Sequence, residues 1–182
     1  METLFAREWQ PHGPTAGGLV LVHGYAEHSG RYEALAAALN NLGIHVFAHD
    51  HRGHGRSPGP RGEIRDFPRL VADLHGQAGH AARVCAGKPL FLLGHSMGGL
   101  VALHYLASDT CRVAGAILSS PLLALTEDVP AWKIRSAHWL GRFAPWLPVE
   151  RLDASAISRD PDAVRTYETD PLIYHGAIRA PS

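Results

Sequence analysis

The feature that most constrains the fold of this chain is a serine set among glycines, Gly-His-Ser-Met-Gly-Gly, at residues 94–99. The apolar residues 90–93 before it suit a strand buried on both faces, and the apolar stretch 100–107 after it suits a buried helix. A chain that passes from strand to helix this quickly must turn sharply, and the residue at the turn takes an unfavourable backbone conformation. Any Cβ at Gly94 or Gly98 would collide with the neighbouring strand or helix.

A turn of this kind presents the hydroxyl of Ser96 at the top of a sheet, where it can act as a nucleophile. The alternative is a glycine-rich loop in which Ser96 only caps the helix. Gly98 and Gly99 make that alternative poor, because two glycines in the first turn disfavour a helix that needs no special geometry. The sequence therefore predicts Ser96 as a catalytic nucleophile.

Strand patterns alternate with helix patterns along the first two thirds of the chain. The expected strands are 19–22, 44–48, 90–93 and 113–119, and the expected helices are 32–42, 68–86 and 100–107. Gly43 should end the first helix, and Pro68 should lie in the first turn of the second. Such alternation predicts right-handed βαβ units in a parallel sheet, an α/β fold.

Length and charge limit the class of partner. The chain has 182 residues, about one domain, with 17 Lys and Arg against 17 Asp and Glu. This balance gives no attraction to nucleic acid or to an anionic membrane, so a small neutral or amphiphilic ligand is expected.

Cysteine usage and the first residues bear on location. Cys85 and Cys111 cannot form a disulfide scaffold, and the start METLFAREWQ lacks the pattern of a signal peptide. No apolar run reaches the ~18 residues that a transmembrane helix needs. A cytoplasmic location is expected.

Thirteen histidines raise the question of a metal site. His49, His51 and His54 crowd one loop, but the chain has no His-Glu-x-x-His helix and no Cys or carboxylate set at ligand spacing. Solvated or hydrogen-bonded loop histidines are the better interpretation, so neither a metal nor a cofactor is expected.

Tryptophans recur after residue 121. Trp132, Trp139 and Trp146 are spaced seven apart with Phe143 between them, so on a helix they would share one face. That face either packs in an ordinary core or belongs to a mobile lid that lines an acyl pocket.

Four sequence blocks together resemble one family. HGYAEHSGRY (23–32), HDHRGHGRS (49–57), GHSMGG (94–99) and DPLIYHG (170–176) are similar to the monoacylglycerol lipase and lysophospholipase branch of the α/β-hydrolase superfamily, among the S33-type serine hydrolases. The resemblance implies a mostly parallel sheet with helices on both faces and a helical cap. The core would then comprise residues 1–121, the cap 122–175, and the start of a further core segment 176–182.

The resemblance also implies roles for particular residues. Ser96 would attack an ester carbonyl, and the backbone N–H groups of Tyr25 and Met97 would form the oxyanion hole that stabilises the developing alkoxide. Glu27, Arg31 and His95 would lie near the alcohol part of the substrate. Glu27 and Arg31 are open to a second interpretation, as a surface ion pair.

The 49–57 block marks the family more strongly than it indicates chemistry. Its glycines permit tight turns, and Asp50 is expected to accept hydrogen bonds from local backbone N–H groups. A phosphate-binding interpretation fails, because these glycines do not open a helix with GxGxxG spacing. We interpret the block as scaffolding.

The resemblance leaves the catalytic acid and base unassigned. The triad order of α/β-hydrolases is Ser, then Asp or Glu, then His, and in the family both partners follow the cap. Asp170 and His175 follow Ser96 in that order, but they lie inside block 170–176, and His95 points away from the hydroxyl. The chain is therefore expected to be a fragment without the last strands, the acid and the base, and to be inactive as it stands.

The leading hypothesis is a serine ester hydrolase that acts on monoacylglycerol or lysophospholipid-like esters through an acyl-enzyme on Ser96. In this hypothesis the cap makes transient contact with a membrane. One alternative is a non-catalytic module that binds amphiphiles through its aromatic cap. Another is a different serine hydrolase of the same fold, such as a peptidase or a general carboxylesterase. Acyl-chain length, head-group preference and oligomeric state stay open.

Overall fold

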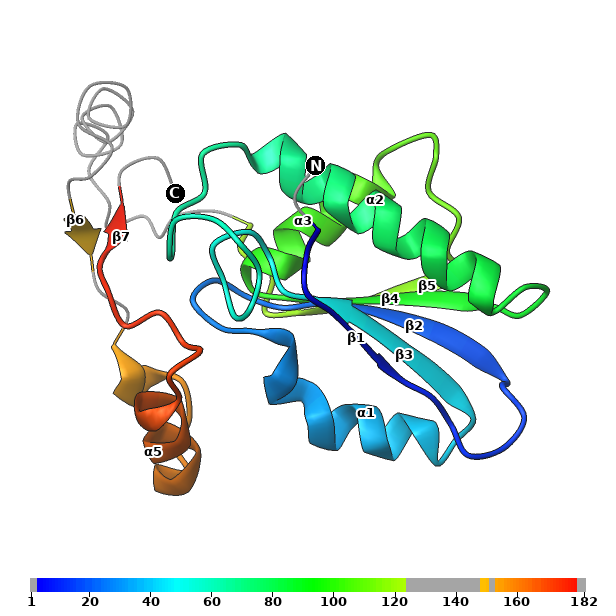
Figure 1. The fold of residues 1–182 in the computed structure, drawn as a ribbon, viewed down its shortest axis with the longest axis horizontal. Coiled ribbons are helices and arrows are strands. Elements are labelled where there is room, and N and C mark those ends of the chain that lie inside the picture. The colour runs from blue at the N-terminus through cyan, green and yellow to red at the C-terminus, as the bar shows by residue number, and fades with distance from the viewer. Residues whose placement is uncertain (1–2, 124–147, 151–152, 180–182) are drawn as a thin grey trace.

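A computed structural model describes residues 3–123, 148–150 and 153–179 (Figure 1). Its centre is a five-stranded sheet in the order β1-β3-β2-β4-β5. The strands are β1 Ala6–Trp9, β2 Gly17–Val22, β3 Ile44–His49, β4 Leu90–His95 and β5 Gly115–Ser119. All neighbours are parallel except β1, which runs antiparallel to β3. The predicted α/β class with a mostly parallel sheet is confirmed.

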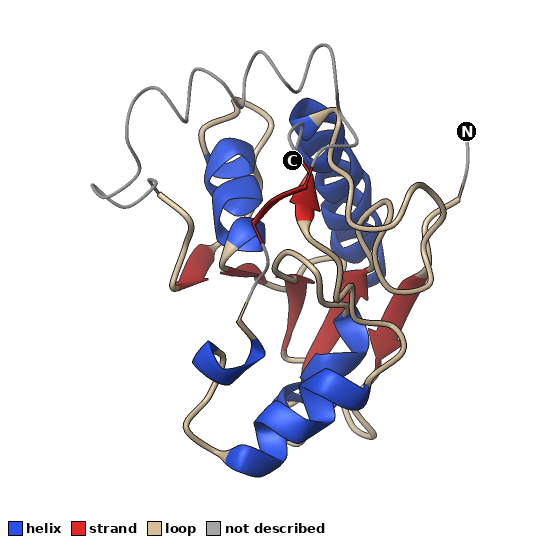
Figure 2. Ribbon diagram, turned by 90° about the vertical axis from the view of Figure 1, so that its left-hand side faces the viewer, coloured by secondary structure: helices blue, strands red, loops and turns tan. Residues whose placement is uncertain are grey.

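Helices cover both faces of the sheet, as Figure 2 shows with the strands as a layer between them. Helix α1, Glu33–Asn40, packs with alternate residues of β2 and β3 on one face. Helices α2, Phe67–Val84, and α3, Met97–Leu106, pack with the intervening residues on the other face. Strands β2, β3 and β4 therefore contribute to both apolar clusters, which is why they read as continuous apolar runs.

The helix boundaries follow from local chemistry. The Asp66 side chain caps α2 by accepting from the Arg69 N–H, and Pro68 lies in the first turn, where a missing N–H costs nothing. Gly43, with φ of 77°, follows α1 and donates its N–H to the Asn40 carbonyl. The helices agree with the predicted ones to within a few residues, although α3 begins at Met97.

Strand β1 was not predicted. It adds an antiparallel edge to β3, and its exposed and half-buried residues alternate. Four residues of mixed polarity carry a weak strand signal, and the partner lies about forty residues further along the chain.

The predicted helix 32–42, of which the structure forms α1 over Glu33–Asn40, is less buried than its apolar spacing suggests. Leu35 is 38% exposed and Leu42 is 72% exposed, whereas Ala36 is fully buried. Helix α1 covers β2 and β3, and no described element covers the same face of β4 and β5, where Ile117 is 56% exposed.

The rest of the described chain lies beyond the sheet. It comprises β6 Pro148–Glu150, the short helix η2 Ala154–Ala156, α5 Pro161–Thr169 and β7 Ile178–Arg179, with β6 and β7 paired antiparallel. A second short helix, η1 Ser29–Tyr32, precedes α1. The aromatic series Trp132, Phe143, Trp139 and Trp146 falls outside the described residues, so the cap remains a prediction.

No helix in the described parts of the chain combines the length and apolar character needed to cross a membrane.

Helix α3 approaches β2 unusually closely. A Cβ on Gly98 would lie 2.2 Å from the Val22 carbonyl oxygen and 2.4 Å from that of His23. Both contacts are with backbone, so neither can be relieved by turning a side chain. Gly98 therefore sets the distance between the helix and the end of the strand.

We predict that Gly98→Ala lowers the free energy of unfolding by about 3 kcal/mol, because the methyl group forces α3 away from β2. Gly76→Ala is the matched control: a Cβ there meets nothing within 4 Å, and alanine should stabilise α2 by about 1 kcal/mol. Urea denaturation measures both variants. A Gly98→Ala chain as stable as the parent would contradict the close-approach argument.

Candidate active site

Ser96 occupies a strained turn between β4 and α3. Its φ of 52° and ψ of −119° are rare for a residue with a side chain. The turn is held from both sides, because the Ser96 N–H donates to the Ser119 carbonyl at 3.0 Å and the Ser96 carbonyl accepts from the Leu122 N–H at 3.0 Å. The Ser96 side chain makes no capping hydrogen bond, so the helix-cap alternative does not hold.

The glycines around Ser96 have the steric role expected of them. A Cβ on Gly94 would lie 2.6 Å from the Gly98 carbonyl oxygen and 2.8 Å from the Gly99 Cα. A Cβ on Gly99 would lie 2.8 Å from the Pro121 side chain. Strand β4, helix α3 and the loop at Pro121 are thus in close contact around Ser96, so the strained backbone of Ser96 has no room to change conformation.

The turn after β2 packs against this serine. A Cβ on Gly24 would lie 3.2 Å from the Ser96 Cβ and 3.4 Å from the His95 ring. Tyr25 follows Gly24 directly, and Met97 is the first residue of α3, where a backbone N–H has no acceptor within the helix. The two candidate oxyanion donors therefore belong to segments that meet beside Ser96.

The Glu27 side chain stabilises the turn after β2 through hydrogen bonds. Glu27 is buried, with 4% of the residue exposed. Oε1 accepts from the Gly24 N–H at 2.6 Å and the Tyr32 hydroxyl at 2.7 Å, and Oε2 accepts from Arg31 at 2.7 Å. Burial, and then the adjacent Glu27 charge, raise the pKa of the Tyr32 hydroxyl, which stays a donor. The pair of Glu27 and Arg31 is thus not an ordinary surface ion pair.

The three residues expected near the alcohol of the substrate line one pocket. Glu27, Arg31 and His95 border a hollow of about 280 Å³, which they share with Tyr32, Leu35, Leu93 and Ser119. The His95 Nδ1 lies 3.1 Å from both the carbonyl and the hydroxyl oxygen of Ser119. The hollow lies beside Ser96 rather than directly over it, since Ser96 is not part of its lining.

The loop histidines were expected to be solvated or hydrogen-bonded. They are buried, not solvated, and the rings of His51 and His54 are hydrogen-bonded to backbone carbonyls. His23, His49, His51 and His54 are at most 2% exposed and form a cluster of rings behind the Gly24 turn. The His51 N–H donates to the His23 Nε2 at 2.9 Å. Neither ring nitrogen of His49 has a hydrogen-bond partner among the described residues.

Burial keeps these rings neutral. It lowers the pKa of His23 and His51 well below the usual value, and neighbouring histidines lower both further. Burial lowers the pKa of His49 to about 4, against the opposing charges of Asp73 and Asp50. Within the described residues, no three His, Cys, Asp or Glu side chains form a group that could hold a metal ion.

Asp50 accepts hydrogen bonds from its own loop, as the sequence suggested, and also from a residue of a distant segment. Its carboxylate is fully buried and accepts from the nearby Arg56 N–H at 2.8 Å. The same carboxylate accepts from the Ser29 N–H at 2.8 Å and from the Ser29 hydroxyl at 2.5 Å. Asp50 therefore joins the loop after β3 to the turn after β2.

The Asp170 carboxylate and the His175 imidazole are not hydrogen-bonded to each other. The Asp170 carboxylate contacts the His28 Nε2 at 2.8 Å, whereas the His175 Nε2 lies 3.3 Å from the Asp170 backbone carbonyl. Burial alone would raise the pKa of Asp170, but hydrogen bonds from His28 and from the Leu172 N–H lower it overall. Among the hydrogen bonds of the described residues, none joins an imidazole to the Ser96 hydroxyl.

Some site residues carried no recognisable signal in the sequence. Ser119 enters the site because β5 pairs with β4 and brings it opposite His95. His28 contacts Asp170, which lies 142 positions further along the chain. Ala26 has a φ of 66°, a conformation that a sequence usually signals by a glycine. These roles depend on contacts between distant segments.

A serine held on a strained strand-to-helix turn at the carboxyl end of an inner parallel strand, with a glycine turn packed beside it, defines an α/β-hydrolase. The family model described as serine aminopeptidase, S33, matches residues 13–181. The chain belongs to this family.

Named relatives agree with this assignment. The chain is 42% identical over 172 residues to a monoacylglycerol lipase of Mycolicibacterium smegmatis, covering 94% of this chain and 61% of that protein. It is 41% identical over 177 residues to a human monoglyceride lipase, covering 97% of this chain and 58% of that protein. It therefore spans about 60% of the length of these two curated relatives.

A solved structure shows the same arrangement. The monoacylglycerol lipase of Paleococcus ferrophilus superposes with a TM-score of 0.83 at 36% identity, covering 98% of this chain and 66% of that one. These findings place the chain in the monoacylglycerol lipase-like branch of the α/β-hydrolases.

We predict that acid destabilises the fold through the histidine cluster. The pKa values of His23, His49, His51 and His54 are lowered in the folded chain, whereas an unfolded histidine titrates near 6.5. Below about pH 6.5 the unfolded chain therefore binds more protons. The free energy of unfolding should fall by about 1.4 kcal/mol per pH unit for each histidine, down to the folded-state pKa, about 4 for His49.

Urea denaturation between pH 7 and pH 4.5 measures this slope. His49→Leu should keep the fold, because neither ring nitrogen of His49 has a hydrogen-bond partner among the described residues. The variant should lower the pH dependence of the free energy of unfolding by the share of one histidine, about 1.4 kcal/mol per pH unit. A slope that does not change in His49→Leu would exclude this residue from the acid response.

Proposed function

We propose that residues 1–182 carry the nucleophile and the oxyanion hole of a serine ester hydrolase that acts on monoacylglycerol or lysophospholipid-like esters. The observation that carries the proposal is Ser96 at φ 52°, with Gly24 packed against its Cβ. The relatives named monoacylglycerol lipase support the ester class. The balanced charge of the chain favours a neutral glyceride.

In the proposed reaction the Ser96 Oγ attacks the ester carbonyl. The negative charge that develops on the carbonyl oxygen is stabilised by the N–H groups of Tyr25 and Met97, two fixed donors worth several kcal/mol. A base, proposed below to lie outside residues 1–182, takes the Ser96 proton and gives it to the departing alcohol, and an acyl-enzyme remains on Ser96. Water then hydrolyses the acyl-enzyme and releases a fatty acid.

The serine needs a base to become nucleophilic at neutral pH. We propose that the acid and the base lie outside residues 1–182 and that this segment alone is inactive. Support comes from the geometry of Asp170 and His175, which do not form a pair. It also comes from the share of the relatives that the chain spans, 61% and 58%.

The alcohol part of the substrate is proposed to contact Arg31 and His95. Both border the hollow beside Ser96, and Arg31 has a side chain that is 33% exposed. Glu27 takes part by holding Arg31, because its carboxylate already accepts three hydrogen bonds. A glycerol-like head group offers hydroxyls that match these donors and acceptors.

The setting of the reaction is also part of the proposal. Cys85 and Cys111 are both free thiols, which suits the cytoplasm. A lipid substrate would require transient contact with a membrane, which we assign to the cap between residues 122 and 175.

The nucleophile can be tested in a chimera. We predict that residues 1–182, joined to the part of the Mycolicibacterium smegmatis monoacylglycerol lipase beyond the matched region, hydrolyse 1-monooleoylglycerol and react with a fluorophosphonate probe at Ser96. Ser96→Ala in the same chimera should lose about 10⁴-fold in rate and all labelling.

Other outcomes point to the alternatives. Hydrolysis of a peptide anilide faster than the glyceride would favour a peptidase, and binding of 1-monooleoylglycerol without hydrolysis would favour a non-catalytic module. Turnover by residues 1–182 alone that disappears in Ser96→Ala would place the base within this segment and return Asp170 and His175 as candidates.

The alcohol site gives a separate prediction. In the chimera, His95→Ala should raise the KM for 1-monooleoylglycerol about fivefold, the loss of roughly one hydrogen bond. The KM for p-nitrophenyl butyrate should not change, because its alcohol has no glycerol hydroxyls. The exposed His12→Ala serves as control. Equal changes for both esters would exclude His95 from alcohol recognition.

A further inference from the structure

The block DPLIYHG at residues 170–176 has no part in the proposed chemistry, yet it packs directly on the turn after β2. The Tyr174 N–H donates to the Ala26 carbonyl at 2.8 Å. The Asp170 carboxylate contacts the His28 Nε2 at 2.8 Å, while the His28 Nδ1 accepts from the Gly30 N–H. Two bonds therefore tie the block to residues that flank Glu27.

The ring of Tyr174 is clamped in place. A Cβ on Gly62, whose φ is 65°, would lie 2.2 Å from that ring, and a Cβ on Gly176 would lie 2.4 Å from it. The Tyr25 ring meets the Tyr174 ring edge-on, with centroids 6.4 Å apart. The Tyr25 hydroxyl donates to the Gly62 carbonyl at 2.6 Å. Tyr174 thus touches the side chain whose own backbone N–H is the proposed oxyanion donor.

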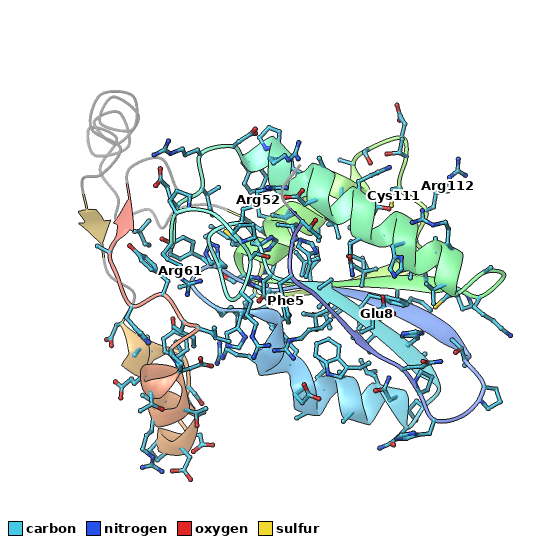
Figure 3. The ribbon with its side chains drawn as sticks, viewed as in Figure 1. Phe5, Glu8, Arg52, Arg61, Cys111 and Arg112 are labelled. Carbon is cyan, nitrogen blue, oxygen red and sulfur yellow. The ribbon has the colours of Figure 1, made fainter. Side chains whose placement is uncertain are left out.

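Arg61 joins the block to the loop after β3. Its guanidinium donates to the Gly55 carbonyl at 2.7 Å and to the Leu172 carbonyl at 2.8 Å. Figure 3 shows Arg61 between that loop and the C-terminal segment. The block therefore contacts two loops: the turn after β2, which packs against Ser96, and the loop after β3, which Asp50 joins to that turn.

The turn needs such support because it is strained. Ala26 has a φ of 66°, in the left-handed region that disfavours a residue with a Cβ. A conformation of this kind persists only where its neighbours hold it. The Ala26 carbonyl is held by Tyr174, and the Gly24 N–H two residues earlier is held by Glu27.

We propose that segment 170–176 is a positioning element for the oxyanion hole: Tyr174 and Asp170 hold residues 23–28 in the conformation that presents the Tyr25 N–H beside Ser96. The part that concerns Tyr25 rests on the proposed function.

Amide hydrogen exchange on residues 1–182 tests the positioning without any catalysis. In Tyr174→Ala the amides of Gly24 and Ser29, which bond to Glu27 and Asp50, should exchange about tenfold faster, while those of β3 keep their rates. Tyr174→Phe should behave as the parent, because the ring fills the same clamp. Asp170→Asn, a milder change, should speed exchange at Gly30 and Ser29. The exposed Glu168→Ala is the control.

Unchanged exchange in Tyr174→Ala would overturn the proposal. So would an increase spread evenly over β2, β3 and β4, which indicates general destabilisation, or an equal effect in Tyr174→Phe, which assigns the effect to the hydroxyl bond with the Ala177 carbonyl.

The chimera supplies the catalytic readout. Tyr174→Ala should lower kcat about tenfold at an unchanged KM, and Tyr174→Phe should restore it. An inactive parent chimera would reject the proposed function and leave the exchange result standing. An active chimera in which Tyr174→Ala hydrolyses the ester at the parent rate would reject the positioning role alone.

Discussion

The contact between α3 and the end of β2 is the constraint on which the site depends. Because Gly98 has no side chain, the helix approaches the Val22 and His23 carbonyls closely enough to bring Ser96 beside Gly24. A wider spacing would separate the serine from the turn that carries the second candidate oxyanion donor. The strain at Ser96 follows from the same approach, since strand and helix must join within a single residue.

Behind this contact the turn is supported by buried polar groups. Asp50 and Glu27 are buried carboxylates, and each accepts three hydrogen bonds. A buried carboxylate is costly unless its oxygens accept hydrogen bonds. The turn after β2 and the loop after β3 therefore stabilise each other only in the arrangement that supplies these bonds. The neutral histidines fit the same arrangement: a proton on the His23 Nε2 would oppose the His51 N–H that now donates to it.

The sequence predicts whatever is encoded locally. Strand and helix patterns, Pro68 in the first turn of α2 and the glycines around Ser96 all act within a few residues, and the structure agrees with them. Strand β1 escaped prediction because a short strand of mixed polarity is recognisable only beside its partner β3. The exposure of Leu35 was not foreseeable, since helical spacing identifies an apolar face but not the element that covers it. The burial of the loop histidines and the link between His28 and Asp170 depend on the folded loops.

Of the four sequence blocks that identify the family, two carry the proposed chemistry and two hold it in place. The block 94–99 supplies the proposed nucleophile. The block 23–32 supplies a strained turn that carries the proposed oxyanion donor Tyr25 and depends on contacts with other blocks. Asp50 braces that turn from the block 49–57, and Tyr174 braces it from the block 170–176. A substitution in either brace changes the turn without touching the substrate. The backbone conformation of the turn depends on contacts from all of these blocks. Residues far from the reacting atoms can therefore be as necessary to the site as Ser96 itself.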